Sequence, residues 1–127
     1  MVSPIYESEA VGFSGDNFLN LVVGITTRLP PRQLADRLRE IEAQHGRVRG
    51  AEKFSSRTLD IDLLTFGEAV VDEKGLQLPR DEILRYAFVL RPLADVAPQE
   101  RHPQSGRSYG ELWAEFDQSG QKLWPVG

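Results

Sequence analysis

A run of branched apolar residues that stops at two consecutive prolines constrains this fold more than any other feature of the sequence. Phe18–Thr27 (FLNLVVGITT) is long enough, and rich enough in branched side chains, to predict a central strand. Pro30 and Pro31 interrupt it, and a proline suits the first turn of a helix. Beyond them, apolar residues recur at helical spacing and predict a helix that ends near Gly46 (Leu34, Leu38 and Ile41). A strand therefore leads directly into a helix.

The rest of the chain mixes strands and helices joined by short links. Leu59–Phe66 (LDIDLLTF) predicts a second strand, which its apolar residues suggest is largely buried, and residues 70–78 predict a hairpin around Asp72–Gly75. Ser108 and Glu111 have the spacing of a capping box, which predicts a last helix. We also expect a short strand over residues 4–8 and helices over residues 79–85, 88–94 and 109–116. The pattern predicts one α+β or α/β domain covering residues 1–127.

The composition narrows the possible environments and partners. The net charge of -4 over 127 residues disfavours bulk attraction to nucleic acid or to an anionic membrane. The chain has no cysteine, which excludes disulfides, thiolate metal sites and cysteine nucleophiles and fits a reducing compartment. No apolar run reaches the roughly 20 residues of a membrane span, and the N-terminus lacks the pattern of a signal peptide. We expect a cytoplasmic protein.

The clearest chemical signal combines a basic loop with two aspartates. Residues 44–57 carry a local charge of +3 (Arg47, Arg49, Lys53 and Arg57 against Glu52). Asp60 and Asp62 follow on one face of the predicted strand, where two carboxylates can share a hard cation such as Mg²⁺. Taken separately, such aspartates are often the solvated face of an edge strand and such arginines a solvated loop. Together they favour phosphoryl transfer on a nucleotide or polyphosphate.

Other familiar catalytic and nucleotide-binding patterns are absent from the sequence. It contains neither the P-loop nor the Rossmann glycine motif, so a nucleotide would be held by arginines and backbone. It offers no serine, histidine and aspartate arrangement for nucleophilic catalysis. His45 lies at a predicted helix C-terminus, where a dipole role is sufficient. His102 lies in a predicted loop with no partner that the sequence identifies.

Residues 53–64 (KFSSRTLDIDLL) resemble the signature of the 6-hydroxymethyl-7,8-dihydropterin pyrophosphokinase family. The upstream residues Glu42, Gly46, Arg47 and Arg49 match the same family, as do Phe18–Asn20 and residues 87–93 (AFVLRPL). The likeness runs in order from about Val2 to Pro98. Its length and order make the resemblance specific.

The resemblance implies an α+β fold, a ferredoxin-like α/β sandwich with a mainly antiparallel sheet. Family members usually open with a strand and a helix for which this sequence has no counterpart before Met1. The strands predicted beside that first strand would then lack ladder partners. Three explanations stay open: a truncated or misassigned start, strand exchange with a second chain in a homodimer, or a different closure of the remaining strands.

The resemblance also implies a function, namely transfer of diphosphate from ATP to the hydroxymethyl group of a reduced pterin in folate biosynthesis. Asp60 and Asp62 would hold two Mg²⁺ ions, and Arg47 and Arg57 would be the catalytic arginines. The residues expected on the ATP side are Glu42, Arg49, Leu63 and Arg80. Those expected around the pterin are Ser8, Val11, Asn20, Phe54 and Phe88. Without the resemblance, a phenylalanine such as Phe88 is more often a core residue than a ring clamp, whereas a buried Asn20 needs a hydrogen-bond partner.

Several positions depart from the family pattern and keep other functions open. Tyr86 stands where the family has an arginine, and Arg80–Asp81 where it often has a histidine-containing pair. Phe54, Ser55 and Gly50 stand where tryptophan, glycine and a basic residue are common. These departures concern ATP contacts more than the aspartates. The alternative is a non-catalytic pterin- or nucleotide-binding relative. A nucleic-acid-binding module is disfavoured because no aromatic residues alternate with the basic ones.

Overall fold

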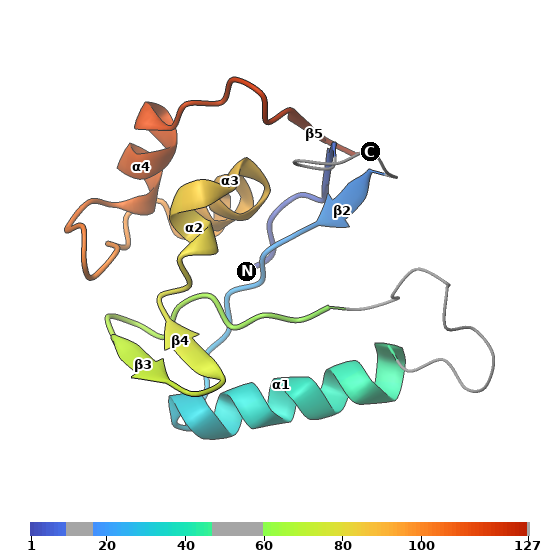
Figure 1. The fold of residues 1–127 in the computed structure, drawn as a ribbon, viewed down its shortest axis with the longest axis vertical. Helices are drawn as coiled ribbons and strands as arrows, with labels where there is room; N and C mark the ends of the chain where they lie inside the picture. The colour runs from blue at the N-terminus through green and yellow to red at the C-terminus, as the bar shows by residue number, and fades with distance from the viewer. Residues whose placement is uncertain (10–16, 47–59, 127) are drawn as a thin grey trace.

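The computed structural model describes residues 1–9, 17–46 and 60–126. In chain order the elements are β1 (Tyr6–Ser8), β2 (Phe18–Asn20), α1 (Pro31–Gly46), β3 (Val71–Glu73), β4 (Leu76–Leu78), α2 (Glu82–Arg85), α3 (Ala87–Val96), α4 (Tyr109–Glu115) and β5 (Leu123–Pro125). Figure 1 shows α3 between α4 and the sheet of β2, β1 and β5, with α1 lying along the β3–β4 hairpin. The expected α+β class with antiparallel pairing is confirmed.

The three-stranded sheet joins the first and last strands of the described chain. β1 is its central strand and pairs antiparallel with β2 and with β5, so Glu7 lies opposite both Leu19 and Trp124. Beyond β2, the pairing among the described residues continues through an isolated bridge between Val2 and Val23. The N–H of Gly24 there donates to the carbonyl of Met1 at 2.8 Å.

Two strand predictions from the sequence are wrong: one strand is shorter than expected, and the described part of the other is not a strand. The strand expected over residues 18–27 ends at Asn20, and the described part of the strand expected over residues 59–66 makes no ladder pairing. That part is also half-buried rather than largely buried, with Asp60 and Asp62 exposed. A strand needs a neighbouring strand for its backbone groups. Among the described residues, the ladder with β1 ends at Asn20, and residues 60–66 pair with no strand.

The β3–β4 hairpin confirms the prediction for residues 70–78 and packs on α1. Val71 pairs with Leu78 and Glu73 with Leu76. Leu76 and Leu78 are buried with Ala35 of α1, and three half-buried side chains pack against them (Leu63, Phe66 and Val71). The apolar face predicted for α1 is thus the one that the helix turns towards the rest of the molecule.

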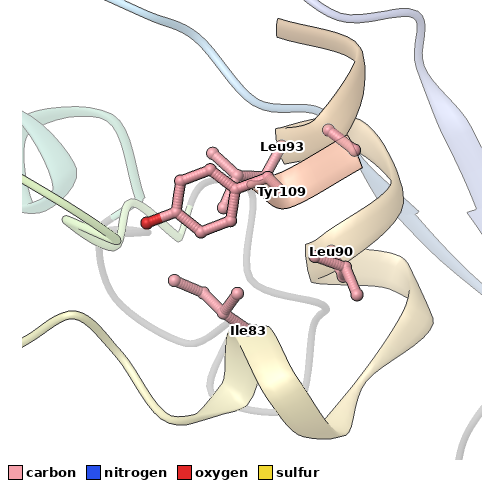
Figure 2. Close-up of a cluster of buried hydrophobic side chains, with 5 residues drawn as sticks. Ile83, Leu90, Leu93 and Tyr109 are labelled. Atoms are coloured by element: carbon pink, nitrogen blue, oxygen red, sulfur yellow. The ribbon is translucent and has the colours of Figure 1, made fainter. Parts of the chain in front are cut away.

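The main hydrophobic core lies between α2, α3 and α4. Figure 2 shows Ile83, Leu90, Leu93 and Tyr109 converging from these three helices. The capping box predicted for α4 is confirmed, because Ser108 Oγ accepts from the N–H of Glu111 at 3.1 Å and Glu111 Oε1 accepts from the N–H of Ser108 at 2.8 Å. Half-buried side chains also pack against this core (Val22, Leu64, Val89, Leu112, Trp113 and Phe116).

The helix expected over residues 79–85 is shorter than predicted. It begins only at Glu82, because the N–H of Arg80 donates to the carbonyl of Leu64 at 3.0 Å and so holds the preceding residues against another segment. The two later helices differ from expectation by no more than two residues at either end. None of the helices formed by the described residues is long and apolar enough to cross a membrane.

Candidate active site

An open pocket of about 320 Å³ lies where residues 62–64, α2 and the first turn of α3 meet the start of β2. Its lining combines apolar and aromatic side chains with three charged ones (Phe18, Leu64, Tyr86, Phe88 and Val89 with Asp62, Arg80 and Glu82). A pocket of this composition suits a ligand that is flat and weakly polar at one end and charged at the other.

The guanidinium of Arg80 organises the charged part of the pocket. Its Nε donates to Glu82 Oε1 at 3.1 Å and its Nη2 donates to Glu82 Oε2 at 2.7 Å, which makes the pair bidentate. Its Nη1 lies 3.9 Å from Asp62 Oδ1. Arg80 is therefore fixed between two carboxylates, and its backbone bond to Leu64 ties it to the segment that carries Asp62.

The ion pair shifts the pKa of both its members in the direction that keeps them charged. The hydrogen bonds from Arg80 lower the pKa of Glu82 below its usual value of 4.5. The same hydrogen bonds, more than the charge of Asp62, raise the pKa of Arg80. Arg80 and Glu82 thus stay charged at neutral pH, and Asp62 places a second carboxylate beside the guanidinium.

Two stacked aromatic rings form the opposite part of the lining. The rings of Tyr86 and Phe88 lie 5.1 Å apart with an interplanar angle of 19°. The guanidinium carbon of Arg85 lies 5.2 Å from the centre of the Tyr86 ring, so the tyrosine also makes a cation–π contact. Tyr86 itself has extended backbone angles (φ -122°, ψ 127°) and separates α2 from α3.

A polar network fastens β1 to α3 near the buried Ser8. The hydroxyl of Tyr6 donates to the carboxylate of Asp95 and accepts from Arg91 Nε, the latter at 3.1 Å. Burial, followed by the hydrogen bond to Asp95, raises the pKa of Tyr6. Ser8 is the next residue on the same side of the strand, and its Oγ is buried without a hydrogen-bond partner among the described residues. Such an oxygen is a candidate acceptor or donor for a ligand.

The structure brings three of the predicted site residues together in the pocket, namely Asp62, Arg80 and Phe88. Asp60 lies two residues before Asp62 with an exposed side chain. Five other predicted residues lie outside the described part of the chain (Val11, Arg47, Arg49, Phe54 and Arg57). Their roles stay predictions.

The remaining predicted residues have structural contacts away from the pocket lining. Glu42 Oε2 accepts from the backbone N–H of Ile61 at 2.8 Å and so anchors the segment between the two aspartates to α1. Leu63 packs against the α1–hairpin cluster. Asn20 lies in β2 opposite Tyr6. Their proposed contacts with ATP or pterin also stay predictions.

Sequence reasoning missed Glu82 and gave Tyr86 no role in the site. Glu82 follows Arg80 by two residues at the start of a predicted helix, a spacing that could have suggested the ion pair. Tyr86 was noticed only as a departure from the family pattern. Within residues 1–9, 17–46 and 60–126, no group of three or more His, Asp or Glu side chains is arranged to hold a metal ion.

Comparison with known families identifies the class of protein. Residues 1–98 match the family model described as 7,8-dihydro-6-hydroxymethylpterin-pyrophosphokinase (HPPK). The chain therefore belongs to the HPPK family, whose members are pyrophosphokinases, ATP-dependent diphosphotransferases of folate biosynthesis. The resemblance drawn from the residues is confirmed.

Individual relatives carry the same description. The chain is 44% identical over 114 residues to the 2-amino-4-hydroxy-6-hydroxymethyldihydropteridine pyrophosphokinase of Pseudomonas aeruginosa, an alignment that covers 89% of this chain and 69% of the relative. Enzymes of the same name from Synechocystis and Bacillus subtilis are 35% and 34% identical, over 95% and 97% of this chain and 60% and 70% of their own lengths. The chain thus spans 60 to 70% of the length of these relatives.

Proposed function

We propose that this chain transfers diphosphate from ATP to the hydroxymethyl group of 7,8-dihydro-6-hydroxymethylpterin and releases AMP. Membership of the HPPK family supports the reaction. The structural observation that supports it best is a pocket lined both by the stacked rings of Tyr86 and Phe88 and by the Arg80–Asp62 pair. A pterin is a flat ring system that stacks well on such a wall, and a polyphosphate is an anion that Arg80 attracts.

The reaction requires charge stabilisation more than covalent help from the protein. The hydroxymethyl oxygen forms a bond to the β-phosphorus of ATP, and the bond from that phosphorus to the oxygen bridging the α-phosphorus breaks. AMP leaves with the bridging oxygen, and the hydroxyl proton passes to water. Arg80, which Glu82 keeps oriented and charged, binds the phosphates. Arg47 and Arg57 are proposed to act on the transferred group and Arg49 on ATP.

Asp60 and Asp62 are proposed to hold magnesium. Both carboxylates are exposed and lie two residues apart, and hard carboxylate oxygens are the ligands that Mg²⁺ combines with phosphate oxygens and water. The donor set therefore fits the two ions expected for the family. When bound, Mg²⁺ would neutralise charge on the phosphate oxygens. Glu42 supports this role because it fixes the backbone of Ile61 between the two aspartates.

The pterin is proposed to bind against Phe88 with polar contacts from nearby strands. The buried Ser8 Oγ lacks a partner among the described residues, and a pterin has ring nitrogens and an amino group that would supply one. Asn20 is proposed to bind the same ring. Val11 and Phe54 complete the proposed pterin contacts, and Leu63 is proposed to pack on the ATP side.

Formation of AMP in the presence of Mg²⁺ and the reduced pterin tests this function. We expect Asp62→Ala to lower kcat by on the order of 100-fold or more, because it removes charge stabilisation at the transferred group. Asp72→Ala is the matched control, since Asp72 is an exposed carboxylate on the β3–β4 hairpin outside the pocket lining. It should leave kcat within twofold of the unsubstituted chain.

The same assay separates the proposed function from its alternative. A folded chain that forms no AMP with both substrates and Mg²⁺ contradicts the proposal. Calorimetric binding of both ligands without AMP would instead identify a non-catalytic relative of the enzyme.

A further inference from the structure

A side chain from the C-terminal part of the chain joins the two helices on either side of Tyr86. α2 ends at Arg85 and α3 begins at Ala87. The Nε2 of Gln121 donates to the carbonyl of Arg85 at 3.0 Å, and its Oε1 accepts from the N–H of Ala87 at 2.9 Å. The two hydrogen bonds therefore bracket Tyr86 from a residue 34 positions beyond Ala87.

These bonds satisfy backbone groups that helix ends leave without partners. The last carbonyls of one helix and the first N–H groups of the next have no partner inside their own helix. Tyr86 occupies the N-cap position of α3, and its side chain makes no capping hydrogen bond. A glutamine amide carries both a donor and an acceptor, so the single side chain of Gln121 completes the end of α2 and the start of α3 together.

A turn hydrogen bond and the strand that follows hold Gln121 in place. Its backbone N–H donates to the carbonyl of Gln118 at 3.1 Å. Two residues later β5 begins, and Leu123 of β5 pairs with Ser8 of β1. Gln121 thus connects the three-stranded sheet to the junction of α2 and α3, although it lies beyond the residues 1–98 that match the family model.

We propose that Gln121 is a positioning residue for the pterin side of the pocket, an inference that rests on the proposed function. By fixing the backbone on both sides of Tyr86, it sets the place of the ring that stacks on Phe88. The charged part of the pocket is held separately, by the Arg80–Glu82 pair and by the bond from Arg80 to Leu64. Loss of Gln121 should therefore weaken binding of pterin more than binding of ATP.

Paired substitutions measure this difference. Gln121→Met keeps the length of the side chain and removes both hydrogen bonds, and Gln118→Met is the control in the same loop. We expect calorimetry to give a dissociation constant for 7,8-dihydro-6-hydroxymethylpterin that is about 3- to 10-fold higher for Gln121→Met, as the loss of a net hydrogen bond or two implies. The constant for a non-hydrolysable ATP analogue with Mg²⁺ should stay within twofold. Gln121→Glu, which keeps the acceptor for Ala87, should fall between, and it carries the same comparison if Gln121→Met does not fold.

The outcomes distinguish failure of this inference from failure of the proposed function. Pterin affinity unchanged in a folded Gln121→Met chain, or equal losses for both ligands, would overturn the positioning role. If the unsubstituted chain binds no pterin, the proposed function fails. Amide hydrogen exchange then tests separately whether Gln121 holds the backbone on both sides of Tyr86. Faster exchange at Ala87 in Gln121→Met than in Gln118→Met supports the bracket around Tyr86, and equal exchange contradicts it.

Discussion

The helical side and the strand side of this molecule bury their apolar residues to very different extents. Ile83, Leu90 and Tyr109, which lie on α2, α3 and α4, are at most 1% exposed. On the strand side, alternate residues from β2 onwards are 43 to 65% exposed (Leu19, Leu21, Val23 and Ile25). Each of these four apolar side chains is exposed, so the strand side leaves apolar surface uncovered among the described residues.

The difference shows how far each kind of element depends on its neighbours. A helix satisfies its own backbone and needs only a partner for one face, which α2, α3 and α4 supply for one another within a short stretch of chain. A strand needs neighbours for its hydrogen bonds as well as for burial. Residues 22–24 contact Met1–Ser3 along one edge, and among the described residues no strand pairs with their other edge. The stability of the described fold therefore resides mainly on the helical side.

The largest effect should come from a cavity on the helical side. Leu90→Ala removes a buried side chain from the centre of the core and should lower the free energy of unfolding by about 3 kcal/mol. The matched change on the strand side, Leu19→Ala, should cost less than about 0.5 kcal/mol because that side chain is already exposed. Urea denaturation followed by circular dichroism measures both. Equal losses of unfolding free energy in the two variants would contradict the difference in burial between the helical side and the strand side.

An intermediate effect should come from the cap of α4. Ser108→Ala removes one half of the capping box and should cost about 1 kcal/mol of unfolding free energy. Ser108→Asp keeps an acceptor for the N–H of Glu111 and should restore most of the loss. The same denaturation assay checks both variants. A neutral Ser108→Ala would mean that tertiary packing alone holds α4 on the helical side.

The smallest effect should appear as a pH dependence at His102, in the loop that leads into α4. Its Nδ1 accepts from the N–H groups of Gln104 and Ser105 at 3.2 and 3.1 Å, and burial lowers its pKa from the usual 6.5. As the pH falls below about 6.5, His102 therefore takes up a proton more readily in the unfolded chain than in the folded chain. The contribution is present above pH 6.5 and is lost as the pH falls through the lower folded-state pKa.

His102→Asn tests this assignment. Asparagine offers an acceptor oxygen and does not titrate in this range, so unfolding free energies measured between pH 5 and about 8 should vary less with pH in the variant. A pH profile identical to that of the unsubstituted chain would assign the dependence to other groups.

Local signals in the sequence predicted the helical side and the hairpin well. The capping box of Ser108, the periodic apolar face of α1 and the turn at Asp72–Gly75 each specify structure through nearby residues, and all three are confirmed. The lengths of the strands could not be predicted in the same way. Residues 18–27 have the composition of a strand, but how much of it pairs depends on what lies beside it in space.

Site residues that belong to a family motif could be predicted from the sequence. Residues whose role depends on contacts between distant parts of the chain could not. The resemblance pointed to Asp62, Arg80 and Phe88, which the pocket brings together. Gln121 could not be found, because a glutamine in a loop gives no signal of the backbone groups it will meet 34 residues away.

The contact between α1 and the β3–β4 turn determines which substitutions the hairpin tolerates. Arg32 Nη2 and Arg39 Nη2 donate to the carbonyls of Lys74 and Gly75 at 2.9 and 2.6 Å, and Arg32 Nη2 also donates to Glu73 Oε1 at 3.0 Å. Apart from the Glu73 carboxylate, the helix therefore contacts the turn through main-chain carbonyls. The side chain at position 74 is therefore free to vary. Position 75 is not, because its φ of +78° favours glycine and an added Cβ would lie 3.3 Å from Arg39. Sequence drift in this turn should thus change its surface chemistry while preserving the way α1 docks.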